Sequence, residues 1–370
     1  MKIVCYKDTL LKALNSVIKG VASKTTNPIL EGILIQTNEN QVKLTTYDME
    51  LGIEYIIDSD VKEQGSTVVN AIMFSEIIRK LPDSEIYITL NSNNLLEIEC
   101  EGALYKLTTM NPDEFPELPK IEVENSIELE QNTLKNMIKR TIFAVSTEES
   151  RPIFTGCLIE TENNKLNIVA VDGFRLALRS VYLTQKTNDF NAVIPGKTLN
   201  EVSKIISGGT DDEVRLYFTE NHVLFEFDDT IVVSRLIEGE YFRIDQMLNS
   251  DYDTKLTVNK KEMLSCIDRT TMLIKDSDKK PIIIGITDHS MEVKLNSAYG
   301  SMKEELAIDK RGKDIMIGFN PKFLIDALRV IDDEMINIYM INPKAPCFIR
   351  NDEGTYIYLI LPVNFNAATN

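Results

Sequence analysis

The chain has 370 residues, of which 43% are hydrophobic and 26% charged, a composition typical of a globular protein with two or three domains. Its longest apolar runs, such as residues 281–286, are too short to cross a bilayer, and the N-terminal residues lack an apolar signal segment. Five isolated cysteines without a C-x-x-C pair fit a reducing compartment, so we expect a cytoplasmic protein with no membrane partner. The net charge of −17 disfavours nucleic acid unless positive charge is gathered on one surface.

Three segments repeat along the chain at a spacing near 125 residues: 10–53, 134–178 and 263–306. Each begins with apolar residues at helical spacing and passes through a proline into a β-branched or aromatic run. The prolines are Pro28, Pro152 and Pro281, which lie 124 and 129 residues apart. A second helix repeats after each of these segments, with anchors at Phe74, Leu199 and Phe323 that are 125 and 124 residues apart.

The pattern predicts one helix and several antiparallel strands in each of six half-domains, an α+β fold. The predicted helices span residues 8–20, 74–81, 133–144, 198–207, 260–272 and 321–330. Segments such as 43–46 and 96–100 alternate as strands that have one helix-packed and one exposed face. Polar turns at 38–40, 91–94 and 163–164 join them. Proline-rich and polar linkers place the domains at 1–120, 121–249 and 250–370.

Positive charge is concentrated in the predicted helices. They contain 13 Lys and Arg against 6 Asp and Glu, a net charge of +7, whereas the rest of the chain carries −24. A surface built from these helices would attract phosphates, although Lys and Arg also favour helices in general. No zinc-finger, helix-turn-helix or RNP signature is present, so we expect backbone contacts without base reading.

No motif for phosphate cradling, metal-dependent proteolysis or nucleophilic catalysis occurs in the sequence. His222 and His289 lie in short polar segments that read as turns, and the acidic clusters 211–213 and 332–334 follow predicted helices. We therefore expect no catalytic residues, no metal and no cofactor. A carboxylate site assembled from several strand ends stays open.

The repeat, the length and several strings resemble the beta subunit of bacterial DNA polymerase III, the DNA sliding clamp family, along nearly the whole chain. The strings are residues 27–32 (NPILEG), 48–50 (DME), 115–118 (FPEL), 171–176 (VDGFRL), 317–320 (IGFN) and 359–363 (LILPV). The resemblance implies a processivity factor, a head-to-tail homodimer forming a ring whose interior is lined by helices. It also implies four kinds of partner: double-stranded DNA, the polymerase III catalytic subunit, a clamp loader and other proteins with clamp-binding motifs.

Site residues carried over from the family fall into three groups. DNA contacts are expected from Lys12, Lys24, Arg79, Arg151, Lys197 and Lys204. A dimer contact is expected from Tyr105, Lys106, Leu107, Met272, Leu273, Glu304 and Glu305, with Lys106 opposite Glu304 or Glu305. A partner-peptide pocket between the second and third domains is expected from Phe154, Val171, Gly173, Phe174, Arg175, Leu176, Phe242, Gln246, Met247, Phe323, Leu359, Ile360, Leu361, Pro362 and Val363.

The pocket strings depart from the family pattern at five positions. The usual Thr, His, Pro, Arg and Arg are here Val171, Phe174, Phe242, Gln246 and Asn364. The resemblance therefore implies a pocket that is more apolar and less basic than usual.

Two other functions remain compatible with the residues. One is a tandem-repeat scaffold that recruits peptide motifs and never meets DNA, and the other is an enzyme on a repeated fold. The mass and scattering profile of the assembly separate a hollow ring from a scaffold.

Overall fold

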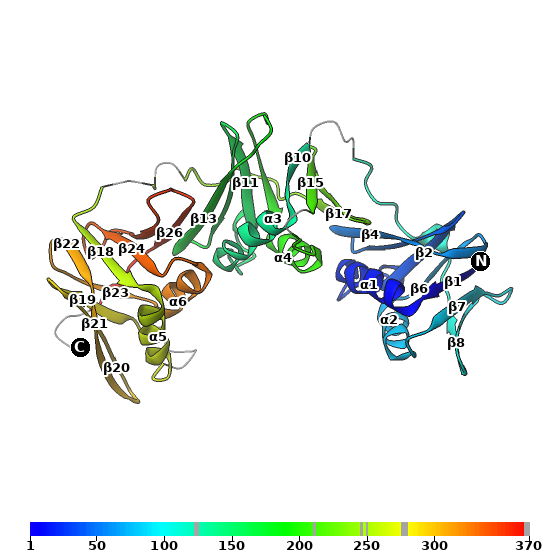
Figure 1. Cartoon of the computed structure of the whole chain (residues 1–370), viewed down its shortest axis with the longest axis horizontal. Helices are drawn as coiled ribbons and strands as arrows, with labels where there is room; N and C mark the ends of the chain where they lie inside the picture. Colours follow the sequence, from blue (N-terminus) through cyan, green and yellow to red (C-terminus); the bar gives the residue numbers. More distant parts are fainter. Residues whose placement is uncertain (122–125, 210–211, 245–246, 249–250, 275–279, 366–370) are drawn as a thin grey trace. The chain divides into compact units, whose positions relative to one another are not determined.

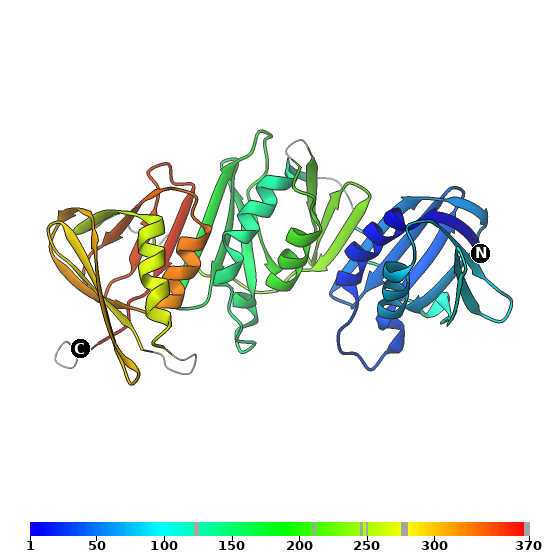
Figure 2. The same ribbon diagram turned by 60° about the horizontal axis from the view of Figure 1, so that its bottom comes forward.

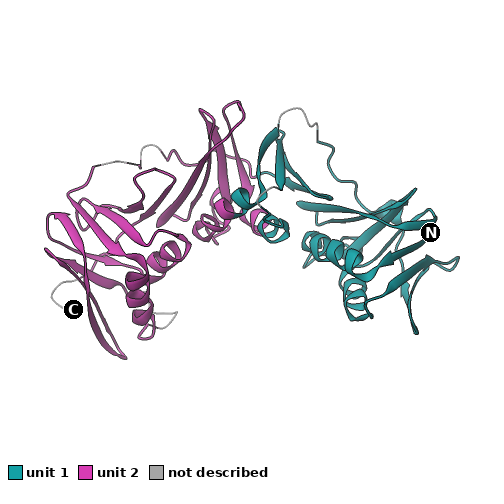
Figure 3. Cartoon of the chain, viewed as in Figure 1, with its two compact units in different colours: residues 1–135, 201–236 teal, residues 136–200, 237–370 magenta. Residues whose placement is uncertain are grey.

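The computed structural model describes residues 1–121, 126–209, 212–244, 247–248, 251–274 and 280–365. The chain forms two compact units, residues 1–135 with 201–236 (unit 1) and residues 136–200 with 237–370 (unit 2) (Figure 3). The division between the two units runs through the predicted second domain, residues 121–249. It therefore does not test the three predicted domain boundaries. None of the helices in the described part of the chain combines the length and apolar character that a bilayer crossing requires.

Unit 1 contains two antiparallel sheets (Figure 1). The first has the order β5 (Asp60–Glu63), β1 (Lys2–Tyr6), β7 (Glu85–Leu90), β8 (Leu95–Cys100) and β9 (Ala103–Thr108). The second has the order β10 (Ser126–Glu130), β15 (Glu213–Phe218), β16 (His222–Phe227), β17 (Thr230–Arg235), β4 (Leu51–Asp58), β3 (Gln41–Tyr47), β2 (Gly32–Asn38) and β6 (Ser66–Asn70).

Unit 2 repeats this plan with a nine-stranded and a four-stranded sheet. The larger has the order β14 (Phe190–Pro195), β11 (Gly156–Glu162), β12 (Lys165–Val171), β13 (Arg175–Tyr182), β26 (Tyr356–Ile360), β25 (Cys347–Arg350), β24 (Met335–Met340), β18 (Thr254–Asn259) and β22 (Asp309–Gly312). The smaller has the order β21 (Gly300–Ala307), β20 (Ser290–Ser297), β19 (Ile282–Ile286) and β23 (Ile315–Phe319).

The six predicted helices are all present, with ends shifted by up to five residues, and two of them are followed by a separate 3₁₀ turn. Their bounds are α1 (Lys7–Val17), α2 (Ala71–Lys80), α3 (Gln131–Lys139), α4 (Gly196–Ile205), α5 (Lys260–Thr271) and α6 (Pro321–Val330). Residues 18–20 and 142–144, predicted as helix ends, form 3₁₀ turns instead. Figures 1 and 2 show α1 beside α2 in unit 1 and α5 beside α6 in unit 2.

Asparagine caps explain where three of the helices begin. The Asn70 side chain accepts a hydrogen bond from Met73 N at 3.0 Å, and Asn320 accepts one from Lys322 N at 3.1 Å. Asn259 does the same at the start of α5. Each cap satisfies an otherwise unpaired amide, which stabilises a helix by about 1 kcal/mol. Because α2 begins directly after its cap at Asn70, it starts three residues before the predicted position.

The second helices of the three repeats bury the same position, counted from the start of each helix, but one predicted residue needs correction. Phe74 and Leu199 are fully buried, as their role as anchors requires. In α6 the buried residue at the same distance from the cap is Leu324, whereas Phe323 is only half-buried. The predicted anchor Phe323 is therefore wrong by one residue, because an apolar side chain stands at both positions and sequence spacing alone cannot choose between them.

The prediction that every sheet has an exposed face holds for strands such as β8 but fails beside the linkers. In unit 2, Tyr241 and Ile244 pack with Leu158, Val169 and Leu178 on one apolar cluster. In unit 1, Phe115 and Leu118 pack similarly against Tyr47 and Val68. The linkers therefore cover sheet faces that would otherwise be exposed, which buries apolar area on both sides of these strands.

Candidate functional site

The turn between β12 and β13 carries a network of side-chain hydrogen bonds. Asp172 Oδ1 accepts hydrogen bonds from Phe174 N at 2.9 Å and Arg175 N at 3.1 Å. Gly173 has a φ of +91°, a conformation that glycine adopts without steric cost. The turn fixes Phe174 outward and Arg175 inward.

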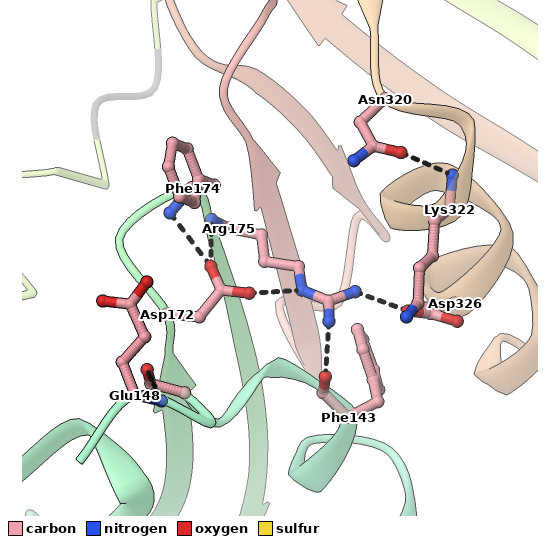
Figure 4. Close-up of polar contacts among 9 residues, drawn as sticks. Phe143, Glu148, Asp172, Phe174, Arg175, Asn320, Lys322 and Asp326 are labelled. Atoms are coloured by element: carbon pink, nitrogen blue, oxygen red, sulfur yellow. Dashed lines mark hydrogen bonds and ion pairs between the residues drawn. The ribbon is translucent and has the colours of Figure 1, made fainter. Parts of the chain in front are cut away.

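Each of the three guanidinium nitrogens of Arg175 donates a hydrogen bond (Figure 4). Its Nε donates to Asp172 Oδ2 at 2.9 Å, Nη1 to Asp326 Oδ2 at 2.6 Å, and Nη2 to the Phe143 carbonyl at 2.7 Å. The guanidinium also lies 4.6 Å from the Phe323 ring centroid. Only 9% of the side chain is exposed, so this cation joins the β12–β13 turn to α6 and is not available as a free charge.

An apolar surface surrounds this buried ion pair. Phe174 is 60% exposed, and its ring stacks on Phe323 with centroids 6.2 Å apart. The segment after β26 lies alongside, because Leu361 N donates to the Phe174 carbonyl and Val363 N to the Gly318 carbonyl. An exposed aromatic surface with a rigid support is typical of protein-binding sites.

The predicted pocket residues separate into core and surface. Val171, Leu176, Leu359 and Ile360 are buried in the sheet, so they support the surface without lining it. Partly or fully exposed are Phe154, Gly173, Phe174, Phe242, Met247, Phe323, Leu361, Pro362 and Val363. Gln246 lies outside the described residues. Sequence reasoning missed Phe143 and Asp326, which lie outside the matched strings; Asp172 lies within one of them and could have been found there.

All six predicted DNA-contact cations are exposed. Lys12, Arg79, Lys197 and Lys204 lie on helices, whereas Lys24 and Arg151 lie in loops. Two have carboxylate partners one helical turn away, since Arg79 pairs with Glu76 at 2.5 Å and Lys204 with Glu201 at 2.7 Å. Such exposed pairs contribute little energy and leave the cation able to exchange partners.

The helix repeat adds a basic position that the motif comparison missed. Arg79, Lys204 and Arg329 each lie nine residues after the residue that precedes their helix, so they occupy one equivalent place in α2, α4 and α6. Arg329 is exposed and pairs with Asp268 at 3.2 Å. Comparison of the three helices after alignment on their starts would have found it.

The two strands predicted to form the dimer contact are both edge strands. β9 ends the five-stranded sheet and β21 ends the four-stranded sheet. Tyr105 and Met272 are exposed, as expected for an interface, and Leu273 is partly exposed. Leu107 is 9% exposed and belongs to the core of its own sheet, because it points to the helix-packed side.

Lys106 and Glu304 point to opposite faces of their sheets. Lys106 pairs with Glu97 of β8 at 2.7 Å, away from the helices, and this hydrogen bond lowers the pKa of Glu97. Glu304 pairs with Arg269 of α5, on the helix side, which lowers the pKa of Glu304. Glu305 follows on the other face.

Two sheet junctions inside the chain follow one pairing rule. β17 pairs antiparallel with β4, placing Val232 opposite Ile53, and β26 pairs with β13, placing Tyr358 opposite Ala177. Each register is fixed further by one amide, since Arg235 N donates to the Glu50 carbonyl and Leu361 N to the Phe174 carbonyl, both at 2.9 Å. The last strand of one repeat thus joins the fourth strand of the preceding repeat. β9 is the last strand of the first repeat, and β21 is the fourth strand of the third repeat. Both lie at sheet edges, so these two strands could form a further junction of the same type.

Two of the carboxylates considered for catalysis have structural partners. Asp332 pairs with Arg140, and Asp333 accepts a hydrogen bond from the Tyr356 hydroxyl. Asp211 lies outside the described residues. His289 is exposed, whereas His222 is partly buried, and burial lowers its pKa. The predicted turn at His222 is present, because Thr219 N donates to the His222 carbonyl at 2.9 Å where β15 ends and β16 begins.

Comparison with known proteins places the chain in a family. Family models for the DNA polymerase III beta subunit match in chain order: the N-terminal domain at residues 1–119, the central domain at 128–242 and the C-terminal domain at 245–364. The Beta sliding clamp of Bacillus subtilis is 36% identical over 98% of this chain and 99% of that protein.

Solved structures agree with this match. The chain is similar to a DNA polymerase III beta subunit from Eubacterium rectale, with a TM-score of 0.96 and 54% identity over 99% of this chain and all of that one. The Bacillus subtilis sliding clamp gives a TM-score of 0.96 with 34% identity over the same shares. Three tandem clamp domains of α+β class define a DNA sliding clamp. This chain belongs to the DNA polymerase III beta subunit family, whose members are processivity factors of DNA replication.

Proposed function

We propose that two copies of the chain join head to tail, β9 of one to β21 of the other, and form a closed ring around duplex DNA. The observation that carries the proposal is the common pairing rule of the two internal junctions, which leaves β9 and β21 as unpaired edges of the right kinds. Such a heterologous contact closes by symmetry when two copies supply it to each other.

The same rule gives a register for the proposed contact. Each strand can be aligned with its counterpart by counting from the turn that precedes it. β9 is aligned in this way with β17, and β21 with β4. Tyr105 then lies opposite Met302 of the second copy, and Thr108 N donates to the Tyr299 carbonyl. Lys106 lies opposite Ser301, so this register replaces the expected pairing with Glu304 or Glu305.

DNA is held without base reading. The helices α1–α6 contain 13 Lys and Arg against 6 Asp and Glu, whereas the whole chain carries −17. Helices lining the ring interior would attract phosphates, and the acidic remainder would repel DNA elsewhere. Exposed cations that pair with neighbouring carboxylates make only weak contacts with phosphates, and weak contacts let the ring slide along DNA.

Partner proteins dock on the aromatic surface around Phe174 and Phe323. We assign there the short motifs of the polymerase III catalytic subunit, the clamp loader and other clamp-motif proteins. The one central cation, Arg175, is neutralised by Asp172 and Asp326, so affinity for these motifs comes from apolar burial more than from charge.

The protein acts without catalysis of its own, in the cytoplasm. Its five cysteines are unpaired and buried, and burial raises the pKa of Cys157 and Cys347 to about 12, so these thiols stay protonated and unreactive. This pattern supports a reducing compartment.

Sedimentation equilibrium over a dilution series tests the proposed assembly. The ring predicts a species of twice the 42.0 kDa chain mass, with a hollow scattering profile. A monomer at all concentrations, or open-ended polymers, would remove the basis of the proposal.

A further inference from the structure

The turn between β20 and β21 is built like the turn that carries Arg175. Ser297 Oγ accepts a hydrogen bond from Tyr299 N at 3.1 Å, as Asp172 accepts one from Phe174 N. Both are two-residue turns at the same place in their repeats, so Tyr299 is equivalent to Phe174 and Gly300 to Arg175. Tyr299 is 55% exposed in the single chain, as Phe174 is.

The equivalent positions on the helices are given by the asparagine caps. Counted from Asn70 and Asn320, Met73 is equivalent to Phe323, and Glu76 to Asp326. Met73 is 54% exposed, and its neighbour Ile72 is also exposed. The first turn of α2 therefore presents an apolar surface where α6 presents the ring on which Phe174 stacks.

The ion pairs that lock the β13–β26 junction have no counterpart at the proposed junction between copies. Gly300 has no side chain to replace the Arg175 guanidinium, and Ser297 replaces the carboxylate of Asp172. Glu76, at the place of Asp326, has its own partner in Arg79. The contact between copies thus lacks the buried cation that joins β13 to α6 within the chain.

We infer that Tyr299 of one copy packs on Ile72 and Met73 of the other, an uncharged contact that takes the place of the Arg175 ion pairs. The inference rests on the proposed head-to-tail ring. A tyrosine on a thioether and an isoleucine buries apolar area and gains from sulfur–aromatic contact.

A double-mutant cycle on subunit exchange tests the contact. Copies labelled with a donor and an acceptor dye are mixed, and the exchange rate is measured for the full chain, Met73→Ala, Tyr299→Ala and the double variant. We expect each single change to speed exchange about tenfold and the double variant to be no faster than about twofold beyond either single one, since both remove one contact. Met335→Ala, an exposed methionine on β24, is the matched control and leaves the rate unchanged.

A charge exchange separates this contact from a merely structural effect. Met73→Lys with Tyr299→Glu restores slow exchange in low salt, and that rate becomes salt-sensitive, whereas the exchange rate of the unaltered chain changes little with salt through this contact. Purely multiplicative effects of the two alanine changes, with no rescue by the charge pair, would overturn the inference while leaving the dimer in place. An unaltered chain that never dimerises would instead overturn the proposed ring.

Discussion

Replacing Arg175 by alanine removes the one cation between two buried carboxylates. The side chains of Asp172 and Asp326 are 14% and 21% exposed, so neither is solvated well enough to carry its charge without a partner. Breaking a buried ion pair of this kind costs about 3–5 kcal/mol. For a unit the size of unit 2, with about 2–4 °C of Tm lost per kcal/mol, the melting temperature should fall by about 10 °C.

Urea denaturation followed by far-UV circular dichroism gives the free energy of unfolding for this test. The double variant Arg175→Ala, Asp326→Ala should recover about 1–2 kcal/mol of the loss, because one uncompensated carboxylate is removed with the cation. A loss below about 1 kcal/mol for Arg175→Ala would refute the view that the arginine joins β13 to α6. A double variant no more stable than the single one would refute the charge argument.

Three further predictions concern charged side chains at the protein surface. Reversing Lys24, Lys197 and Lys204 together to Glu should shorten retention on circular DNA by about tenfold or more while the melting temperature stays within about 2 °C, and unchanged retention would count against the helix-lined DNA path. Lys106→Glu should leave the dimer intact at low salt, because Lys106 pairs within its own sheet; dissociation in sedimentation would restore the pairing with Glu304 or Glu305. The pKa of Glu97 is lowered by Lys106, so its contribution to stability is present above the ordinary Glu pKa of about 4.3 and is lost as pH falls through the lowered value; Glu97→Gln should flatten the unfolding free energy between about pH 5 and pH 3, and parallel curves would reject this.

The sequence alone predicted the helices and many strands because both depend on local periodicity, whereas the edge positions of β9 and β21 were predicted from the family resemblance. Apolar spacing and asparagine caps fix the helices, and alternation with polar turns fixes strands such as β3 and β8. The error at Phe323 arose where two adjacent apolar residues compete for one buried position.

The missed features depend on contacts between residues far apart in the chain. Asp326 meets Arg175 across 151 residues, and no local pattern indicates the partner of a buried charge. The linker residues Tyr241 and Leu118 look like loop residues in sequence, yet they cover sheet faces. The shared register of the two junctions also appears only once the pairing partners are known.

Retention on nicked circular DNA, after loading by a clamp loader, tests the central claim most directly. A closed ring should stay on the circle through gel filtration and leave when a single cut makes the DNA linear. Equal retention on circular and linear DNA, or no retention on either, would contradict topological encirclement.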